Sequence, residues 1–417
     1  MNLEINKGDF YLLNGPAKVK VTSGLLECIA APVATGEIIN VPVGKKVPLL
    51  GVKKSKVSVQ AKNSQISKLE TSTIPIEWDI LATTISKEKK RGKLYKVLVL
   101  GEVDTGKTFF STYLANRLLS KVGKTAILDT DTGQSDIGCP GFFGMLVLKK
   151  PEVFLAEQEP THQYMIGAHS SNLHFLPTAS GLVHMLRKAE KDADALIIDT
   201  TGWVQFDGGR AVKKAKLDMV DPDKVVLMQR GNELEHLVKH LPASKVVRLP
   251  VSKKASPTSQ MDRKALRELV SRRYFKGTKE FAIPFKQVFT DRCFLKTGTK
   301  IKLNGALWAE KLSGFEGTLV VTDKPITDAM KKKWPKDIGF IRNFIAGNEK
   351  GVLTALLDEN QDVLAAARLV AFDFKNEKFI VQSTYKGDKK LIKGIQFGSL
   401  KVTKDGNEAG FIEPGSF

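Results

Sequence analysis

At 417 residues the chain is long enough for two or three domains, and its 42% hydrophobic and 26% charged residues exclude overall disorder. No apolar run approaches the roughly 18–20 residues of a membrane span, and the first residues lack a signal peptide's basic and apolar regions, so we expect a soluble, untargeted protein with no membrane partner. The 65 Lys and Arg against 45 Asp and Glu give a formal net charge of +20, which favours a polyanionic partner such as nucleic acid, although many basic proteins are merely basic.

Residues 1–92 are predicted to form an N-terminal β-rich domain. Short β-branched segments, broken by Gly, Pro and polar residues, predict strands at Ala17–Thr22, Gly36–Pro42 and Lys56–Gln60. No helical periodicity is sustained in this region. The charged run Ser86–Lys93 predicts a solvated boundary to the next domain.

Residues 93–277 carry a different pattern, in which apolar runs alternate with helical periodicity. The expected strands are Lys96–Leu100, Thr125–Leu128, Ala195–Ile198 and Lys224–Met228. After the first strand, apolar residues recur at helical spacing from Phe110 to Val122, and Gly123 follows as a stop signal. This alternation predicts an α/β fold, with a parallel sheet and helices on both of its faces.

Residues 278–417 return to short strands separated by Gly, Asp and Asn turns. Examples are Lys300–Leu303, Gly351–Leu357 and Lys378–Ser383. The predicted layout is therefore an N-terminal β-rich domain at 1–92, an α/β core at 93–277 and a mostly β C-terminal domain at 278–417.

A complete G-x4-G-K-[ST] P-loop lies between the first strand and helix of the core, which is the context this motif requires. It consists of Gly101, Glu102, Val103, Asp104, Thr105, Gly106, Lys107 and Thr108. The glycines let backbone N–H groups turn toward phosphate oxygens, and the helix presents its N-terminus to the same anion. Lys107 is expected to reach the β- and γ-phosphates and the Thr108 hydroxyl to bind Mg²⁺. No N/T-K-x-D sequence follows a later strand, which favours ATP over GTP.

Two further loops follow predicted strands and so face the ligand edge of a parallel sheet. Asp129 and Asp131 lie at i and i+2. One carboxylate can hold Mg²⁺ through water and the other can accept a proton from an attacking hydroxyl; a solvated acid or a helix cap is the alternative. In the second loop, Trp203 is either a core anchor or a platform that stacks on a nucleobase.

The segment Lys253–Lys276 is rich in Lys and Arg. Arg263 and Arg267 are spaced i, i+4 and therefore share a helical face. A basic solvated face is one interpretation. The other is a mobile lid that brings Arg to the transferring phosphoryl group, which the Ser-, Lys- and Pro-rich stretch Ser252–Gln260 would permit.

Together these motifs resemble the polynucleotide 5′-hydroxyl kinase family, which includes the RNA kinase associated with pre-mRNA cleavage factor and its nucleolar and archaeal relatives. The features that carry the resemblance are GEVDTGKT at 101–108, DTDTGQSDIGCPG at 129–141, DTTGWV at 199–204 and the Arg-rich stretch that ends in Arg273–Phe275. The end of the chain, Gly394–Val402, is most similar to archaeal members. Some members of the family have lost kinase activity, but Lys107, Thr108 and Asp131 are intact here.

The resemblance implies a P-loop NTPase core that transfers the γ-phosphate of ATP to the 5′-hydroxyl end of RNA, with DNA left open as a second acceptor. By the same resemblance Asp131 activates the hydroxyl, Trp203 stacks on the terminal nucleotide, and Arg263 and Arg267 belong to the lid. The remaining expected substrate contacts are Gln134, Thr201, Gly202 and Ser170, and the expected Mg²⁺ residues are Thr108, Asp129 and Asp131. Ser170 lies in Gly167–Asn172, the candidate for the family's substrate clasp, which here lacks the usual Thr and Pro.

Three other functions remain open at this point: an ATP-binding scaffold in an RNA-processing assembly with little turnover, a kinase for small metabolites, and a nucleic-acid-stimulated ATPase. The large basic surplus argues against a small acceptor, which needs no extended cationic path. Protein partners in RNA processing fit the resemblance. With only three widely spaced Cys residues, we expect an intracellular protein, cytoplasmic in an archaeon and nuclear in a eukaryote.

Overall fold

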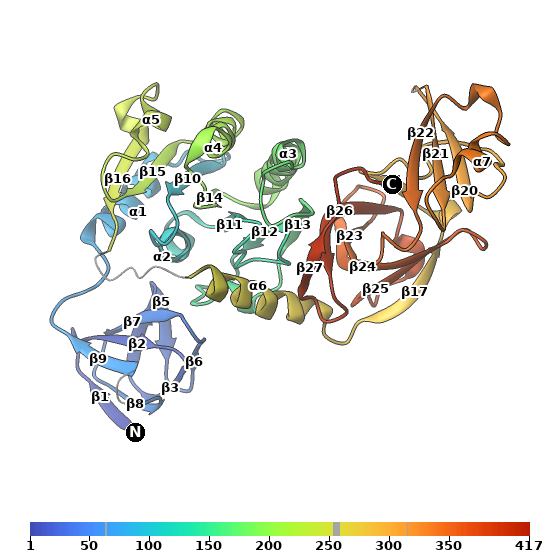
Figure 1. The fold of residues 1–417 in the computed structure, drawn as a ribbon. Coiled ribbons are helices and arrows are strands. Elements are labelled where there is room, and N and C mark those ends of the chain that lie inside the picture. The colour runs from blue at the N-terminus through green and yellow to red at the C-terminus, as the bar shows by residue number, and fades with distance from the viewer. Residues whose placement is uncertain (63–64, 253–258, 315) are drawn as a thin grey trace. The chain divides into compact units, whose positions relative to one another are not determined.

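The computed structural model describes residues 1–62, 65–252, 259–314 and 316–417 (Figure 1). The chain forms two compact units. The first contains Met1–Thr130, Met145–Thr161 and Leu182–Thr258, and the second contains Asp131–Gly144, His162–Gly181 and Ser259–Phe417. The three-domain layout drawn from the sequence stays a prediction. No helix among the described residues is both long and apolar enough to cross a membrane.

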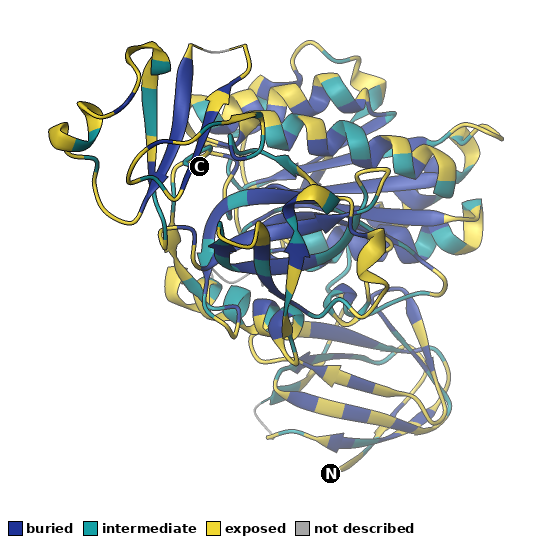
Figure 2. Ribbon diagram, turned by 90° about the vertical axis from the view of Figure 1, so that its right-hand side faces the viewer, coloured by how far each residue is buried: buried dark blue, intermediate teal, exposed yellow. Residues whose placement is uncertain are grey.

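The N-terminal region is β-rich, as predicted. One sheet has the strand order β1-β8-β3-β6 and the other β5-β4-β7-β2-β9. The strands are β1 (Asn2–Ile5), β2 (Phe10–Asn14), β3 (Ala17–Ser23), β4 (Leu25–Cys28), β5 (Ala31–Ala34), β6 (Ile38–Val41), β7 (Lys46–Gly51), β8 (Ser55–Gln60) and β9 (Ile66–Leu69). Buried and exposed residues alternate along β3 and β8, because one face of each strand packs inward (Figure 2).

The sequence shows no sustained helical periodicity in residues 1–92, but the structure has a helix there. Helix α1 (Ile76–Glu88) buries Trp78, Leu81, Ala82 and Ile85. The Trp78 ring packs edge-on against Phe110 and Tyr113 of helix α2 (Lys107–Val122), with ring centroids 5.0 and 5.3 Å apart. Helix α1 therefore packs on the helix that follows the P-loop.

The predicted parallel sheet is confirmed. In the first unit its strands lie in the order β11-β14-β10-β15-β16, and every neighbouring pair is parallel. They are β10 (Tyr95–Gly101), β11 (Thr125–Thr130), β14 (Ala195–Thr200), β15 (Lys224–Gln229) and β16 (Val246–Pro250). The residues of β10, β11, β14 and β15 are almost all buried, as continuous apolar runs require in a sheet that is covered on both faces, whereas only Leu249 is buried in β16.

Helices connect these strands. They are α2, α3 (Phe175–Asp192), α4 (Phe206–Val220) and the short α5 (Glu235–Val238). In α2 the predicted apolar positions Phe110, Leu114 and Leu118 are buried, and Gly123 follows the last residue of the helix. The strand order places β14 between β10 and β11. The carboxyl end of β14 therefore lies beside the P-loop strand.

The second unit is mostly β-structure. One sheet has the order β17-β25-β24-β23-β26-β18 with β27 paired to β26, and another has the order β19-β20-β21-β22. Their strands are β17 (Lys279–Pro284), β18 (Phe289–Asp291), β19 (Gly298–Lys300), β20 (Trp308–Leu312), β21 (Gly317–Thr322), β22 (Phe340–Ile345), β23 (Val352–Leu357), β24 (Val363–Asp373), β25 (Lys378–Ser383), β26 (Gly394–Val402) and β27 (Glu408–Phe411). The unit also contains β13 (His162–Met165), α6 (Gln260–Phe275) and α7 (Asp328–Lys331), and β12 (Phe142–Val147) runs from it into the first unit. Strands β13 and β12 belong to the same seven-stranded sheet as β11, in which they precede β11 in the strand order.

Most of the C-terminal predictions hold. The strand Lys378–Ser383 matches β25 residue for residue, and Gly351–Leu357 differs from β23 by one residue. The strand predicted at Lys300–Leu303 is wrong over most of its length, since β19 ends at Lys300. An aromatic core that includes Phe285, Phe372 and Phe379 packs beneath these sheets.

Candidate active site

The P-loop has the backbone geometry of an anion-binding turn. Strand β10 ends at Gly101 and helix α2 begins at Lys107. Between them Asp104 and Gly106 take positive φ values of 58° and 85°, which turn the backbone sharply. Gly106 has no side chain to cap helix α2, and the N-terminus of a helix attracts an anion through its N–H groups.

Lys107 and Thr105 both lie against the loop backbone. The Lys107 ammonium donates to the Glu102 carbonyl at 2.6 Å, and the Thr105 hydroxyl donates to the same oxygen at 2.9 Å. Lys107 is 8% exposed, so its charge is held inside the loop. The guanidinium of Arg230, which follows β15, donates to the Asp104 carbonyl at 3.1 Å. Arg230 is a P-loop contact that the sequence analysis did not identify.

Asp199 is a candidate site residue that the sequence analysis did not single out. It lies near the end of β14 and is 2% exposed. Its Oδ2 accepts a hydrogen bond of 2.6 Å from the hydroxyl of Thr108, the predicted Mg²⁺ residue. The available signal was an apolar run, Ala195–Ile198, that ends directly in an acid. A hydroxyl and a carboxylate this close form the oxygen donor set that Mg²⁺ prefers.

The predicted acid Asp129 lies beside Asp199. Asp129 of β11 and Asp199 of β14 are paired residues of neighbouring parallel strands. Asp129 is 3% exposed, so it is a buried strand-end group. The solvated-acid interpretation of Asp129 is therefore wrong.

The loop after β14 packs directly on the P-loop. A Cβ atom built on Gly202 would lie 2.6 Å from the Val103 nitrogen, so only glycine fits there without a shift. The Gln205 side chain reaches Glu102 Oε1 at 3.2 Å. Trp203 is partly exposed and lies outside the buried core, which favours the substrate-contact interpretation over the core anchor. Phe206, 80% exposed at the start of α4, is a second aromatic residue near Trp203 in the chain.

Asp131 begins a tight turn in the second unit. Its Oδ1 accepts hydrogen bonds from the backbone N–H groups of Gly133 at 3.0 Å and Gln134 at 3.1 Å. The Gln134 side-chain amide donates to the Arg263 carbonyl of helix α6 at 3.1 Å. The acid turn and the predicted lid helix are thus directly bonded within this unit.

Helix α6 confirms that Arg263 and Arg267 lie on one helix. The hydroxyl of Ser259 caps it by accepting a hydrogen bond of 3.1 Å from the Asp262 N–H. Lys253 and Lys254, with the rest of 253–258, lie outside the described residues.

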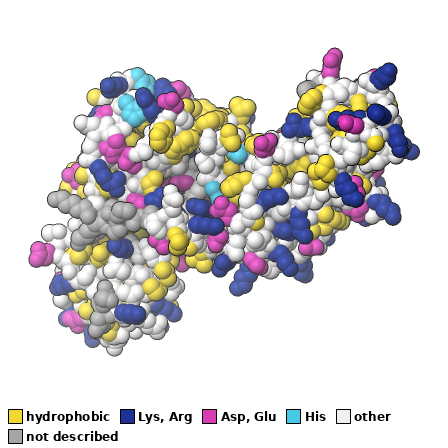
Figure 3. Space-filling view, viewed as in Figure 1, with side chains coloured by type: hydrophobic (Ala, Val, Ile, Leu, Met, Phe, Trp, Pro, Cys, Tyr) yellow, Lys and Arg dark blue, Asp and Glu magenta, His cyan; other side chains and the backbone are white. Residues whose placement is uncertain are grey.

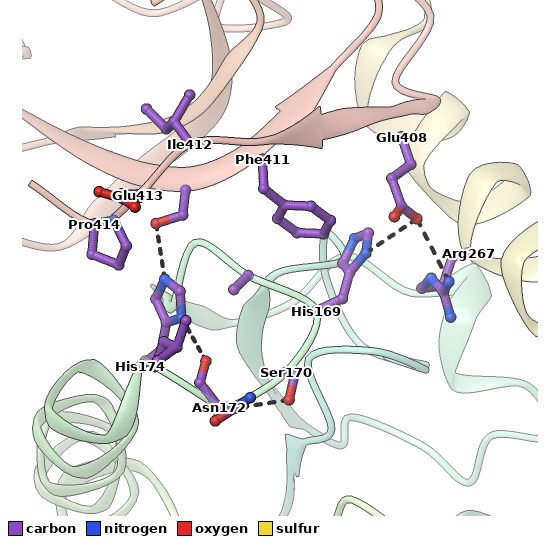
Figure 4. Close-up of a pocket in the computed structure, with 13 residues that line it drawn as sticks. His169, Ser170, Asn172, His174, Arg267, Glu408, Phe411, Ile412, Glu413 and Pro414 are labelled. Atoms are coloured by element: carbon purple, nitrogen blue, oxygen red, sulfur yellow. Dashed lines mark hydrogen bonds and ion pairs between the residues drawn. The ribbon is translucent and has the colours of Figure 1, made fainter. Parts of the chain in front are cut away.

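A pocket of about 510 Å³ lies in the second unit beside Arg267 (Figure 4). The Glu408 carboxylate of β27 points toward the His169 ring at 3.5 Å and the Arg267 guanidinium at 3.6 Å. The close approach of the His169 ring, with the charge of Arg267, lowers the pKa of Glu408 to about 2. Ser170 is exposed on the pocket wall, and its Oγ accepts from the Asn172 N–H at 3.1 Å.

The predicted residues therefore fall into two groups. The P-loop residues, Asp129, Thr201, Gly202 and Trp203 gather at the carboxyl end of the sheet in the first unit. Asp131, Gln134, Ser170, Arg263 and Arg267 belong to the second unit. A parallel sheet with strand, P-loop and helix in this order defines the class: the protein is a P-loop nucleotide-binding protein.

The comparisons with known proteins show which family the P-loop region resembles. Residues 101–277 match the model of the family described as mRNA cleavage and polyadenylation factor CLP1 P-loop. A polyribonucleotide 5′-hydroxyl-kinase of Pyrococcus abyssi is 28% identical over 337 residues, which cover 79% of this chain and 94% of the relative. A polyribonucleotide 5′-hydroxyl-kinase of Methanocaldococcus jannaschii is 29% identical over 335 residues, with 78% and 92% covered.

A solved structure shares the fold. The chain superimposes on the structure of a wild-type Clp1p–Pcf11p complex with a TM-score of 0.67 and 14% sequence identity, over 96% of this chain and 97% of that one. The predicted architecture, an α/β P-loop core with β-rich regions toward both termini, is confirmed.

Proposed function

We propose that this chain is an ATP-dependent polynucleotide 5′-hydroxyl kinase that acts on RNA. The single observation that carries the proposal is the complete P-loop whose Thr108 hydroxyl is bonded to Asp199, in a segment that matches the CLP1 P-loop family model. The relatives named as polyribonucleotide 5′-hydroxyl-kinases match this chain over most of their own lengths, which supports the same activity here.

In the proposed reaction the 5′-hydroxyl oxygen of RNA attacks the γ-phosphorus of ATP in line, and the bond to the β-phosphate oxygen breaks to release ADP. The P-loop N–H groups and Lys107 hold the β- and γ-phosphates. For that role the Lys107 ammonium exchanges the Glu102 carbonyl for phosphate oxygens. Thr108, with Asp199 behind it, would hold Mg²⁺, which neutralises phosphate charge when it is bound. Asp129 is a second buried carboxylate at this edge.

The acceptor is activated and positioned by the two strand-end loops. Asp131 accepts the proton of the attacking hydroxyl as the new O–P bond forms. Trp203 stacks on the terminal base and gives the orientation that lets transfer compete with hydrolysis. Gln134, Thr201, Gly202 and Ser170 complete the proposed substrate contacts.

The lid arginines stabilise the transferring group. Arg263 and Arg267 would place guanidinium charge against the equatorial oxygens of the phosphoryl group. In the structure Arg267 lies 3.6 Å from Glu408, so this carboxylate competes with the phosphoryl group for Arg267.

Surface charge supports a polymeric acceptor. Lys and Arg side chains are numerous on the face shown in Figure 3, and many lie over the C-terminal elements. Lys331, Lys332 and Lys333, for example, are all exposed, whereas the neighbouring Trp334 is buried. Such a surface suits a phosphate backbone better than a small metabolite. DNA as a second acceptor and protein partners in RNA processing are part of the same proposal.

The test is transfer of label from γ-labelled ATP to a 5′-hydroxyl RNA oligonucleotide in the presence of Mg²⁺. We expect label on this RNA, none on a 5′-phosphorylated RNA of the same sequence, and none with Lys107→Ala or after chelation of the metal. A DNA oligonucleotide of equal length measures acceptor preference. Tight ATP binding without label would support the scaffold function, and release of inorganic phosphate alone would support the ATPase.

A further inference from the structure

Helix α4 carries two lysines whose burial the proposed reaction does not explain. Lys213 and Lys216 are both 0% exposed and are among the largest fully buried side chains of the described structure. They lie three residues apart and so share one face of the helix. Burying an ammonium group is costly unless it is well bonded, and an apolar side chain of similar size would fill the same space at lower cost.

Lys213 binds the start of the Trp203 loop. Its ammonium donates to the Thr200 hydroxyl at 2.8 Å and also to the Thr201 carbonyl. Thr201 is followed in the chain by Gly202 and Trp203. Lys213 therefore fixes the backbone from which the proposed base-stacking residue projects.

Lys216 binds the end of the neighbouring strand. Its ammonium donates to the Thr130 hydroxyl at 2.7 Å and lies 3.4 Å from the Thr130 carbonyl. Thr130 is the last residue of β11 and directly precedes Asp131 in the chain. Lys216 thus holds the backbone from which the proposed proton acceptor projects.

The two lysines also determine which way the Thr200 and Thr130 hydroxyls donate their hydrogen bonds. An ammonium group only donates hydrogen bonds. Each threonine hydroxyl that accepts from it must therefore donate its own hydrogen to a different acceptor. Thr200 donates to the Val99 carbonyl of β10 at 2.7 Å, and Thr130 donates to the Asp199 carbonyl of β14 at 2.6 Å. The chain of bonds runs from α4 through both threonines to the P-loop strand and to Asp199.

We propose that Lys213 and Lys216 are positioning residues of the kinase, which fix the loops bearing Trp203 and Asp131 through the hydroxyls of Thr200 and Thr130. The proposal rests on the proposed function. Lys213 acts on how the acceptor end is bound, whereas Lys216 acts on the chemical step. The hydrogen bonds of the two lysines go to Thr200, Thr201 and Thr130, so we expect loss of either ammonium to affect acceptor binding or the chemical step more than ATP affinity.

The test compares Lys213→Met and Lys216→Met with Lys214→Met, a matched control on the same helix whose side chain is 47% exposed and pairs with Asp218. We expect Lys216→Met to lower kcat by about 100-fold, the cost of misplacing a reacting group by roughly 1 Å, with ATP affinity unchanged. Lys213→Met should mainly raise the KM for RNA. Lys214→Met should match the wild type.

A second measurement separates this proposal from the proposed function. Hydrogen–deuterium exchange of peptides that cover 199–205 and 129–135 should rise in the Lys213 and Lys216 variants respectively, whether or not the wild type labels RNA. A wild type without label but with these exchange changes would overturn the kinase and keep the positioning role. Unchanged exchange together with unchanged kinetics would overturn the positioning role alone.

Substitution of Thr130, the hydrogen-bond partner of Lys216, distinguishes a specific effect of Lys216 from a general loss of folding. Thr130→Val keeps the shape of the side chain but removes the hydroxyl, whereas Thr130→Ser keeps the hydroxyl. If Lys216 acts through this group, Thr130→Ser retains activity, and Thr130→Val adds nothing to the loss caused by Lys216→Met. Additive losses, or loss of ATP affinity in parallel with kcat and thermal stability, would show that Lys216 is only structural.

Discussion

Gly202→Ala tests the contact between the aromatic loop and the P-loop. The added Cβ would lie 2.6 Å from the backbone nitrogen of Val103 and 2.7 Å from its Cα. Ordinary contact begins at 3.4 Å, so the two loops must separate by about 0.8 Å. Gly202 does not have a positive φ, so the effect is steric rather than conformational. Both obstructing atoms are backbone, which cannot rotate away.

A displacement of this size should be expensive for catalysis. A misplacement of about 1 Å costs roughly 100-fold in rate, so we expect kcat/KM for RNA labelling to fall by nearly that factor. The stability cost of such overpacking is about 1–3 kcal/mol, which a chain of this size tolerates. ATP affinity should fall as well, because Val103 lies within the phosphate-binding loop.

The assay is steady-state labelling of a 5′-hydroxyl RNA, with ATP binding measured by calorimetry and folding by thermal melting. Gly231→Ala is the matched control, since its Cβ would meet nothing closer than Glu233 Oε2 at 3.6 Å. Wild-type kinetics and ATP affinity in a folded Gly202→Ala protein would refute the reasoning, because they would show that the two loops do not depend on each other's position.

Three further predictions concern single side chains. Asp199→Asn should lower kcat by about 10- to 100-fold and raise the Mg²⁺ concentration needed for half-maximal labelling, because it removes the charge behind Thr108; an unchanged Mg²⁺ titration would contradict this. Trp203→Ala should raise the KM for RNA about tenfold or more, since stacking contributes about 1–3 kcal/mol per base, while ATP binding stays intact; equal loss of both would make Trp203 structural. Glu408→Gln should lower the melting temperature at pH 7, and the difference from the wild type should shrink as the pH falls from about 4.5 toward 2: the pKa of Glu408 is lowered from 4.5 to about 2 in the folded chain, so its stabilising contribution is present above the higher value and lost below the lower one.

The elements that the sequence predicts well are those with one unambiguous period. Strands β10, β11, β14 and β15 of the parallel sheet are continuous apolar runs, and their predicted positions match the structure to within one or two residues. Strand β16 of the same sheet, which is mostly not buried, was not predicted. Helix α1 was missed although Trp78, Leu81, Ala82 and Ile85 have helical spacing. Ile76 and Ile80 of the same helix are 71% and 58% exposed, so apolar residues on a second face obscure the period. Which apolar face of the helix packs into the core depends on burial, and burial is a property of the whole fold.

Some residues of the candidate site can be predicted from their neighbours in the sequence, whereas others depend on contacts made only in the fold. The P-loop is eight consecutive residues, so its chemistry can be predicted from spacing alone. Asp199 lies 91 residues from Thr108, and their hydrogen bond exists only because β14 pairs with β10. Chain order does not fix that neighbour, since β11 follows β10 in the sequence and yet lies one strand further away. The lysines of α4 are harder still, because a Lys at helical spacing ordinarily indicates a solvated face. Their contacts with Thr130 and Thr200 become visible only once the helix is seen to cover the ends of two strands.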